Sequence, residues 1–301
     1  MNPILEFDNV SRSYKPGPPV LNGVSFAMTE GEVVGLVGRN GAGKTTLLRI
    51  AMGMLAPHPG RVLVFGLSPT EDPVEVKKRI GYVAEDQVLP PTSSIAELIS
   101  FHTYLFPSWD RGMERDLMER FGLSPKSRIR SLSKGQARQV ALLLAICHRP
   151  ELLILDEPAG GLDPAARREF LEASIQLLNR EGSAILFSSH NLQDIERIGA
   201  RVILLDQGKV RLDMALDRMR EDVSVVMIPK ASMADAAVIE RMPGCLGVRS
   251  VADSWHAVFD GAPEAVTARL NGGVGQVQCV RAPLEELFVE LVGGKRPGAE
   301  L

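Results

Sequence analysis

Residues 38–46 have the types and the spacing that bind a phosphate chain. The loop consists of Gly38, Arg39, Asn40, Gly41, Ala42, Gly43, Lys44, Thr45 and Thr46, and it matches the pattern G-x-x-x-x-G-K-[ST] at every fixed position. The glycines let backbone N–H groups turn toward phosphate oxygens. In this pattern Lys44 reaches the terminal phosphates of a nucleotide, and the Thr45 hydroxyl binds Mg²⁺. The alternative is a glycine-rich turn with an incidental lysine.

The segments on both sides of this loop provide the context that phosphate binding requires. Residues 33–37 form a continuous apolar run, which is typical of a parallel strand buried on both faces. Leu47, Ile50, Ala51 and Met54 recur at the spacing of one helix face. We therefore expect the loop between a strand and a helix N-terminus, whose partial positive charge favours anions.

Two acidic residues follow a second apolar run. Residues 152–155 deliver Asp156 and Glu157 at the carboxyl end of a predicted strand, where open α/β sheets bind their ligands. Burying two carboxylates costs free energy unless each one is paired with a cation or accepts a proton. A Mg²⁺ ion held by Asp156 through water, and a general-base role for Glu157, meet both demands. The alternative is an acid pair that caps the next turn.

Three further features are suited to a nucleotide. His190 follows the apolar run 184–187, although a single histidine at a strand end is more often structural. Ser133–Gln136 has the S-x-x-Q form of a capping box, which either marks an ordinary helix start or offers an anion site. Tyr14 precedes the loop on a β-rich segment, where its ring either stacks on a nucleobase or is an ordinary half-buried strand-end residue.

The apolar periodicity predicts an α/β protein with two domains. Residues 1–220 are expected to form the main domain, with an N-terminal β-layer, a parallel-rich sheet and a helical insertion over residues 88–149. Residues 221–301 alternate between strand-like and helical segments, which indicates a small α+β domain with a four-stranded sheet. No motif in this second domain suggests chemistry.

The composition argues against several function classes. The chain has 301 residues, is 45% hydrophobic and carries a net charge of -3, so it can form a large core and has no broad basic face for nucleic acid. Three cysteines without C-x-x-C spacing argue against a disulfide framework or a zinc site. No signal peptide is recognised, and the longest apolar run, Val140–Cys147, is far shorter than the ~18 residues of a membrane span. A membrane role would therefore depend on another chain.

Taken in order, these features resemble the nucleotide-binding subunit of an ATP-binding-cassette (ABC) transporter over residues 4 to about 212. The matching motifs are Walker A (residues 38–45), the signature (132–136), Walker B (152–157), the D-loop (161–163, with Asp163) and the switch histidine, His190. Tyr14 falls where the family places the aromatic residue that stacks on adenine. The ordered set is far more specific than any single motif.

The resemblance implies a P-loop NTPase fold and an ATPase mechanism. Two such subunits, identical or different, dimerise head to tail around ATP and Mg²⁺. Lys44 would hold the phosphates, Glu157 would polarise the attacking water, and His190 would keep the γ-phosphate and that water aligned. The signature residues that would contact the ATP of the second subunit are Ser133, Lys134, Gly135 and Gln136.

The resemblance also implies a membrane partner. ATP binding and hydrolysis would drive a separate transmembrane permease, which would hold this chain at the cytoplasmic face of the membrane. Residues 106–110, the Ser-Lys-Gly-Gln signature and residues 283–288 resemble the branch that serves bacterial ABC-2-type exporters. We therefore expect export, and we expect no direct contact with nucleic acid.

Three positions depart from the common family pattern: Glu85, Lys134 and Ala159. Glu85 stands where the Q-loop usually carries glutamine, and Gln87 follows two residues later. Thr45 and Asp156 are the expected Mg²⁺ ligands, and Glu85 is a candidate additional ligand, although its replacement of glutamine weakens the case for metal coordination at this loop. Lys134 replaces the commoner glycine of the signature without removing a required group.

Other function classes fit the sequence less well. A cassette protein acting on ribosomes or nucleic acid typically carries two cassettes or a long coiled coil, and no sustained heptads separate Lys44 from Leu132. A regulator that binds nucleotide without turnover is disfavoured by the Asp156-Glu157 pair and His190. A GTPase is disfavoured because no N-K-x-D motif follows the phosphate loop.

Overall fold

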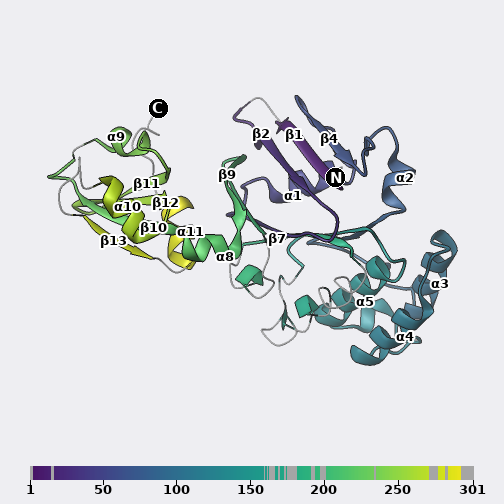
Figure 1. Cartoon of the computed structure of the whole chain (residues 1–301). Coiled ribbons are helices and arrows are strands. Elements are labelled where there is room, and N and C mark those ends of the chain that lie inside the picture. Colours follow the sequence, from purple (N-terminus) through teal and green to yellow (C-terminus); the bar gives the residue numbers. More distant parts are fainter. Residues whose placement is uncertain are drawn as a thin grey trace. The chain divides into compact units, whose positions relative to one another are not determined.

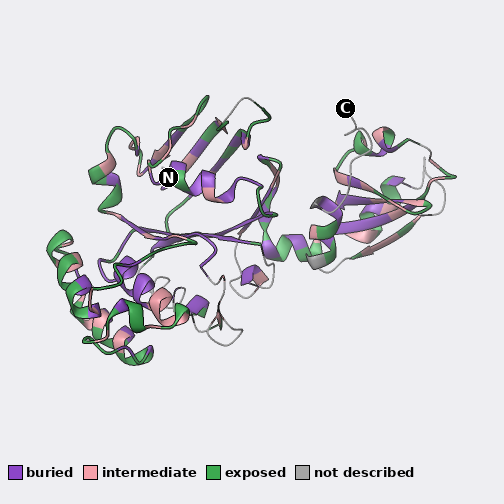
Figure 2. Ribbon diagram, turned by 180° about the vertical axis from the view of Figure 1, so that it is seen from behind, coloured by how far each residue is buried: buried purple, intermediate pink, exposed green. Residues whose placement is uncertain are grey.

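The apolar runs of the sequence form the strands of a six-stranded sheet in the computed structural model (Figure 1). They are β3 (Val33–Val37), β5 (Ile80–Val83), β6 (Leu152–Leu155), β7 (Ala184–Ser189), β8 (Arg201–Asp206) and β9 (Lys209–Ala215). Their order is β5-β6-β7-β3-β8-β9, and the pairs β5/β6, β6/β7 and β3/β7 are parallel. The carboxyl ends of these four parallel strands therefore meet at one edge. All residues of β6 and β7 are buried, as expected for apolar strands covered on both faces (Figure 2).

The structure describes residues 3–14, 17–158, 160, 162, 167–168, 170–172, 174, 182–190, 194–196, 201–233, 235–270, 277–281 and 284–292. The chain divides into two units. The first is Met1–Ala200 with Gln207–Lys209, and the second is Arg201–Asp206 with Val210–Leu301. The domain boundary expected between residues 220 and 221 stays a prediction.

A second, antiparallel layer precedes the phosphate loop in the sequence. It has the order β2-β1-β4, with β1 (Leu5–Arg12), β2 (Leu21–Met28) and β4 (Arg61–Val64). The rings of Phe7 and Phe26 pack across β1 and β2 with centroids 4.8 Å apart. The helices near this layer are α1 (Lys44–Ala51) and α2 (Pro73–Lys77). The helix α2 was not predicted, because its five residues carry too short a periodic pattern.

Helices occupy the segment that the sequence predicts as a helical insertion. They are α3 (Ile95–Leu105), α4 (Arg111–Arg120), the short 3-10 helix η1 (Ile129–Ser131) and α5 (Lys134–Ile146). Both α3 and α5 begin with a capping box, from Ser94 and from Ser133. Asp110 caps α4 and also forms an ion pair with Arg149 just beyond α5. The ion pair therefore ties the C-terminal end of α5 to the start of α4.

The C-terminal segments form a four-stranded antiparallel sheet with the order β11-β12-β10-β13. Its strands are β10 (Val223–Pro229), β11 (Cys245–Val251), β12 (Ser254–Asp260) and β13 (Gln278–Arg281). The helices are α8 (Leu216–Glu221), α9 (Ala236–Glu240), α10 (Pro263–Leu270) and α11 (Leu284–Val292). The succession from β10 to β13 is the split βαβ arrangement, β-α-β-β-α-β. Its core includes Trp255, Phe259 and Ile239. Within the described part of the chain, no helix combines the length and apolar character needed to cross a bilayer.

Candidate functional site

The phosphate loop lines an open pocket at the carboxyl edge of the parallel strands. The loop connects β3 to α1, as predicted, and Gly43 at the start of α1 has a φ of 106° that favours glycine. The pocket has a volume of about 280 Å³ and is lined by seven loop residues together with Val20, Glu85 and Glu157. The loop residues on its wall are Arg39, Asn40, Gly41, Gly43, Lys44, Thr45 and Thr46. Gly38 and Ala42 complete the loop around them.

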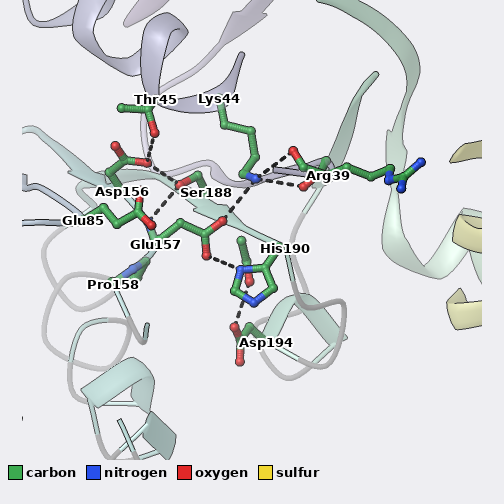
Figure 3. Close-up of polar contacts among 12 residues, drawn as sticks. Arg39, Lys44, Thr45, Glu85, Asp156, Glu157, Pro158, Ser188, His190 and Asp194 are labelled. Atoms are coloured by element: carbon green, nitrogen blue, oxygen red, sulfur yellow. Dashed lines mark hydrogen bonds and ion pairs between the residues drawn. The ribbon is translucent and has the colours of Figure 1, made fainter. Parts of the chain in front are cut away.

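Lys44 is buried at the base of this pocket, where three groups hold its ammonium group (Figure 3). Its Nζ donates to the carbonyl of Gly38 at 2.8 Å and to that of Arg39 at 3.4 Å. The same Nζ lies 3.1 Å from Oε1 of Glu157, and both side chains are less than a tenth exposed. Walker A and Walker B therefore meet directly through an ion pair that the sequence did not predict.

Asp156 connects the loop to β7. Its Oδ1 accepts a hydrogen bond from Thr45 Oγ1 at 3.2 Å and one from Ser188 Oγ at 2.8 Å. Burial raises the pKa of the Asp156 carboxyl, and the two hydroxyl donors oppose that shift. Its Oδ2 is buried and has no hydrogen-bond partner among the described residues. A carboxylate oxygen left free beside a threonine hydroxyl is a donor set that fits Mg²⁺.

Glu157 and His190 face each other at the same strand ends. His190 Nδ1 lies 2.8 Å from Glu157 Oε2, while Lys44 holds the other carboxylate oxygen (Figure 3). The Glu157 backbone is left-handed, with a φ of 45°, and its N–H donates to Ser188 Oγ at 2.9 Å. The His190 side chain is 54% exposed, so it is accessible to solvent while it contacts Glu157.

Ser188 bonds both acidic residues, and sequence reasoning missed this role. Its hydroxyl donates to Asp156 and accepts from the Glu157 backbone. The residue is fully buried at the end of β7. The available signal was a serine directly after the apolar run 184–187. The pairing of that strand with the Walker B strand is known only from the structure.

Tyr14 lies against the phosphate loop. Its hydroxyl is 3.2 Å from Thr46 Oγ1, and the Arg12 guanidinium carbon lies 5.7 Å from its ring centroid. Tyr14 is 54% exposed, so its ring has a face open to solvent. The structure thus places Tyr14 beside the loop, just beyond the end of β1 and outside the pocket wall, with more than half of the residue exposed.

Glu85 rather than Gln87 lines the pocket. The side chain of Gln87 instead accepts a hydrogen bond from the backbone of Ala84 at 3.3 Å. Burial raises the pKa of Glu85, and the negative charges of Asp156 and Glu157 raise it further. The pocket wall therefore carries a carboxyl group at the position where glutamine is commoner in the family.

The signature residues do not line this pocket. Ser133 and Gln136 form the predicted capping box: the Ser133 hydroxyl accepts from the backbone of Gln136, and the Gln136 side chain accepts from the backbone of Ser133, each at 3.1 Å. Lys134 and Gly135 lie in the first turn of α5. Asp163 of the D-loop lies outside the described residues.

Comparison with known proteins agrees with this geometry. The family model described as ABC transporter matches residues 21–160. The ABC transporter ATP-binding protein YtrB of Bacillus subtilis is 29% identical over 297 residues, which cover 97% of this chain and 99% of that protein. The Nod factor export ATP-binding protein I of Rhizobium etli is 30% identical over 296 residues, covering 96% of this chain and 93% of that protein.

Solved structures agree as well. A dimeric structure of a post-hydrolysis state of an ATP-binding cassette, bound to ADP and Pi, matches with a TM-score of 0.62 and 25% identity. The match covers 70% of this chain and 98% of that one. The predicted α/β fold of an ABC ATPase is thereby confirmed. The chain belongs to the ABC transporter family, in which it is an ATP-binding subunit that hydrolyses ATP.

Proposed function

We propose that this chain dimerises on ATP and uses ATP hydrolysis to power export through a separate membrane permease. The observation that carries the proposal is the cluster of Lys44, Glu157 and His190, joined by contacts of 3.1 and 2.8 Å. Lys44 and Glu157 line the pocket, and His190 holds Glu157 from outside its wall. The Rhizobium etli relative aligns with nearly the whole chain, and its name, Nod factor export ATP-binding protein I, supports export. The alternative, a cassette acting on ribosomes or nucleic acid, has no comparable support from the described residues.

Each residue of the cluster has a defined task in the proposed hydrolysis. The loop N–H groups and Lys44 bind the phosphates of ATP and stabilise charge that develops on them. Water attacks the γ-phosphate, and Glu157 accepts the proton of that water as ADP and phosphate form. His190, bonded to the second oxygen of Glu157, orients this carboxylate toward the water.

We place Mg²⁺ between the phosphates and Asp156. Thr45 would bind the ion directly and Asp156 through water, and Glu85 is the candidate for an additional ligand from the pocket wall. When bound, the ion neutralises negative charge on the phosphates. The free Oδ2 of Asp156 supports this assignment.

The proposed dimer is a homodimer or a heterodimer with another ABC ATPase subunit. Ser133, Lys134, Gly135 and Gln136 would contact the ATP held by the Walker A loop of the second subunit. Their position outside the pocket of their own chain supports this arrangement. The helix N-terminus formed by Ser133 presents backbone N–H groups that suit a phosphate.

The permease would dock on residues 88–110, which would hold the chain at the cytoplasmic face of the membrane. Val88 is 85% exposed and Tyr104 86% exposed, and Phe101 and Leu105 add further apolar surface on α3. A photo-crosslinker at Tyr104 should capture a transmembrane protein in native membranes. The same group at exposed Glu71 serves as the control. Capture of ribosomal protein or nucleic acid instead would support the alternative function.

The decisive experiment uses Glu157→Gln. This variant retains the shape of the side chain but cannot accept the proton, so it should bind ATP, stop hydrolysing it and accumulate as a dimer with ATP and Mg²⁺. Exposed Glu71→Gln is the matched control and should behave as the unaltered protein. Unchanged steady-state hydrolysis by Glu157→Gln would overturn the assignment of the general base.

A further inference from the structure

Arg138 joins three backbone positions on the rim of the ATP site. It lies in the second turn of α5, on the same helix that Ser133 caps. Its Nη1 donates to the carbonyl of Glu157 at 3.2 Å and to that of Pro158 at 3.3 Å. Its Nη2 donates to the carbonyl of Glu85. One planar guanidinium therefore ties the Walker B segment and the Q-loop to the signature helix.

These carbonyls belong to the segments that carry two of the carboxylates on the pocket wall. Glu157 has a left-handed backbone, which non-glycine residues rarely adopt, so surrounding contacts must hold it. Ser188 bonds the N–H of Glu157, and Arg138 bonds its carbonyl. Side chains from two other elements therefore fix the backbone N–H and the carbonyl of Glu157, the proposed general base.

The chemistry of arginine suits this position. A guanidinium has five N–H donors in a rigid fork, whereas a lysine ammonium is a single point on a flexible chain. Arg138 is about half-buried, and its positive charge faces Glu85, Asp86, Asp156 and Glu157. Without the Arg138 guanidinium, three backbone carbonyls would lose their hydrogen-bond donor, and four acidic groups would lose a nearby positive charge. The segment that contains Glu157 would then be free to shift.

We propose that Arg138 is a positioning residue for ATP hydrolysis, which fixes the main chain of Glu157 and of the Q-loop onto the signature helix. The inference rests on the proposed function, because it acts through Glu157 as general base. It also gives a physical connection between two sites. The helix that would contact the ATP of the second subunit is bonded, through Arg138, to the main chain of Glu157, which acts on the ATP of its own chain.

The test compares Arg138→Lys and Arg138→Met in the full-length chain. We expect Arg138→Met to lower kcat by roughly 10- to 100-fold, because a displaced general base loses its alignment with the water. The Kd for ATP should remain within about threefold, since Arg138 does not line the pocket. Arg138→Lys should recover part of kcat because the ammonium still reaches one carbonyl.

A matched control is available in the same helical segment. Arg128 also donates to a backbone carbonyl, that of Thr92 at 2.7 Å, but does not line the pocket. Arg128→Met should keep kcat. Thermal unfolding of each variant corrects the rates for any loss of folded protein. Undiminished kcat in both Arg138 variants, or a loss of kcat no greater than in Arg128→Met, would overturn the proposal.

A double variant that combines Arg138→Lys with Glu157→Gln tests the role of Arg138 separately from the proposed function. If Arg138 acts through Glu157, adding Arg138→Lys to Glu157→Gln should leave the residual rate unchanged, because the base it positions is already lost. A further drop in the double variant would assign Arg138 a role independent of Glu157 and overturn the inference. Failure of Glu157→Gln itself to lose activity would instead overturn the proposed function.

Discussion

The ammonium nitrogen of Lys44 lies 3.1 Å from Oε1 of Glu157, and both side chains are buried. The ion pair joins the first residue of α1 to a residue just beyond the end of β6. Each charge therefore depends on the other, because both side chains are less than a tenth exposed and water can replace little of either partner. This dependence affects stability as well as catalysis.

Lys44→Met should lower the free energy of unfolding by about 3 kcal/mol, since it leaves a buried carboxylate without its cation. Adding Glu157→Gln to Lys44→Met should recover much of that loss. Urea unfolding without nucleotide measures both effects, and exposed Lys126→Met is the control. Equal free energies of unfolding for Lys44→Met and for the double variant would show that the unpaired Glu157 carboxylate contributes little to the loss of stability.

Ser188→Ala should raise the Mg²⁺ concentration needed for half-maximal hydrolysis by roughly 10- to 100-fold, because Ser188 orients Asp156. The measurement is an ATPase titration with Mg²⁺ at fixed ATP. Ser183→Ala is a matched control, since Ser183 is also buried but donates to the carbonyl of Pro150 away from the pocket. An unshifted Mg²⁺ dependence in Ser188→Ala would contradict the role of Ser188.

Tyr14→Ala should weaken ATP binding by ~1 to 3 kcal/mol if the exposed ring stacks on the base. Tyr14→Phe removes only the hydroxyl near Thr46 and should change the affinity by less than about 1 kcal/mol. Titration of each variant with ATP gives both values. Equal affinities for the unaltered protein and Tyr14→Ala would make Tyr14 an ordinary strand-end residue.

His148 should make the fold sensitive to acid. Burial lowers its pKa from 6.5 to about 4, although a hydrogen bond with the carbonyl of Ile80 opposes that shift. Phe106 stacks on the imidazole, with centroids 4.2 Å apart. Between these two pKa values the unfolded chain binds a proton that the folded chain does not. The stability contributed by neutral His148 is therefore full above pH 6.5 and is lost as the pH falls toward 4.

The size of this effect is about 3 kcal/mol, at about 1.4 kcal/mol per pKa unit. Urea unfolding at several pH values should show that His148→Gln flattens the decline. The substitution of exposed His58 by glutamine should leave the decline unchanged. If both variants show the same pH dependence, other groups cause the acid sensitivity.

Local pattern determined most of the elements and the identity of the site. The glycine spacing before Lys44 predicts a phosphate loop, because that spacing lets several N–H groups turn toward one anion. The apolar runs at 33–37 and 152–155 became β3 and β6. The capping box at Ser133 formed as predicted, since its two hydrogen bonds join residues three apart.

Tertiary structure alone decided which distant residues meet. Thr45 and Asp156 are 111 residues apart, and Arg138 and Glu85 are 53 apart, so no periodic pattern relates them. Thr45 and Asp156 meet because β5, β6, β7 and β3 are neighbours whose carboxyl ends share one edge. That order also places Ser188 between two acids. Arg138 meets Glu85 because α5 packs against β5. Strand order reflects packing of the whole core, whereas the sequence pattern reports only which face of an element is buried.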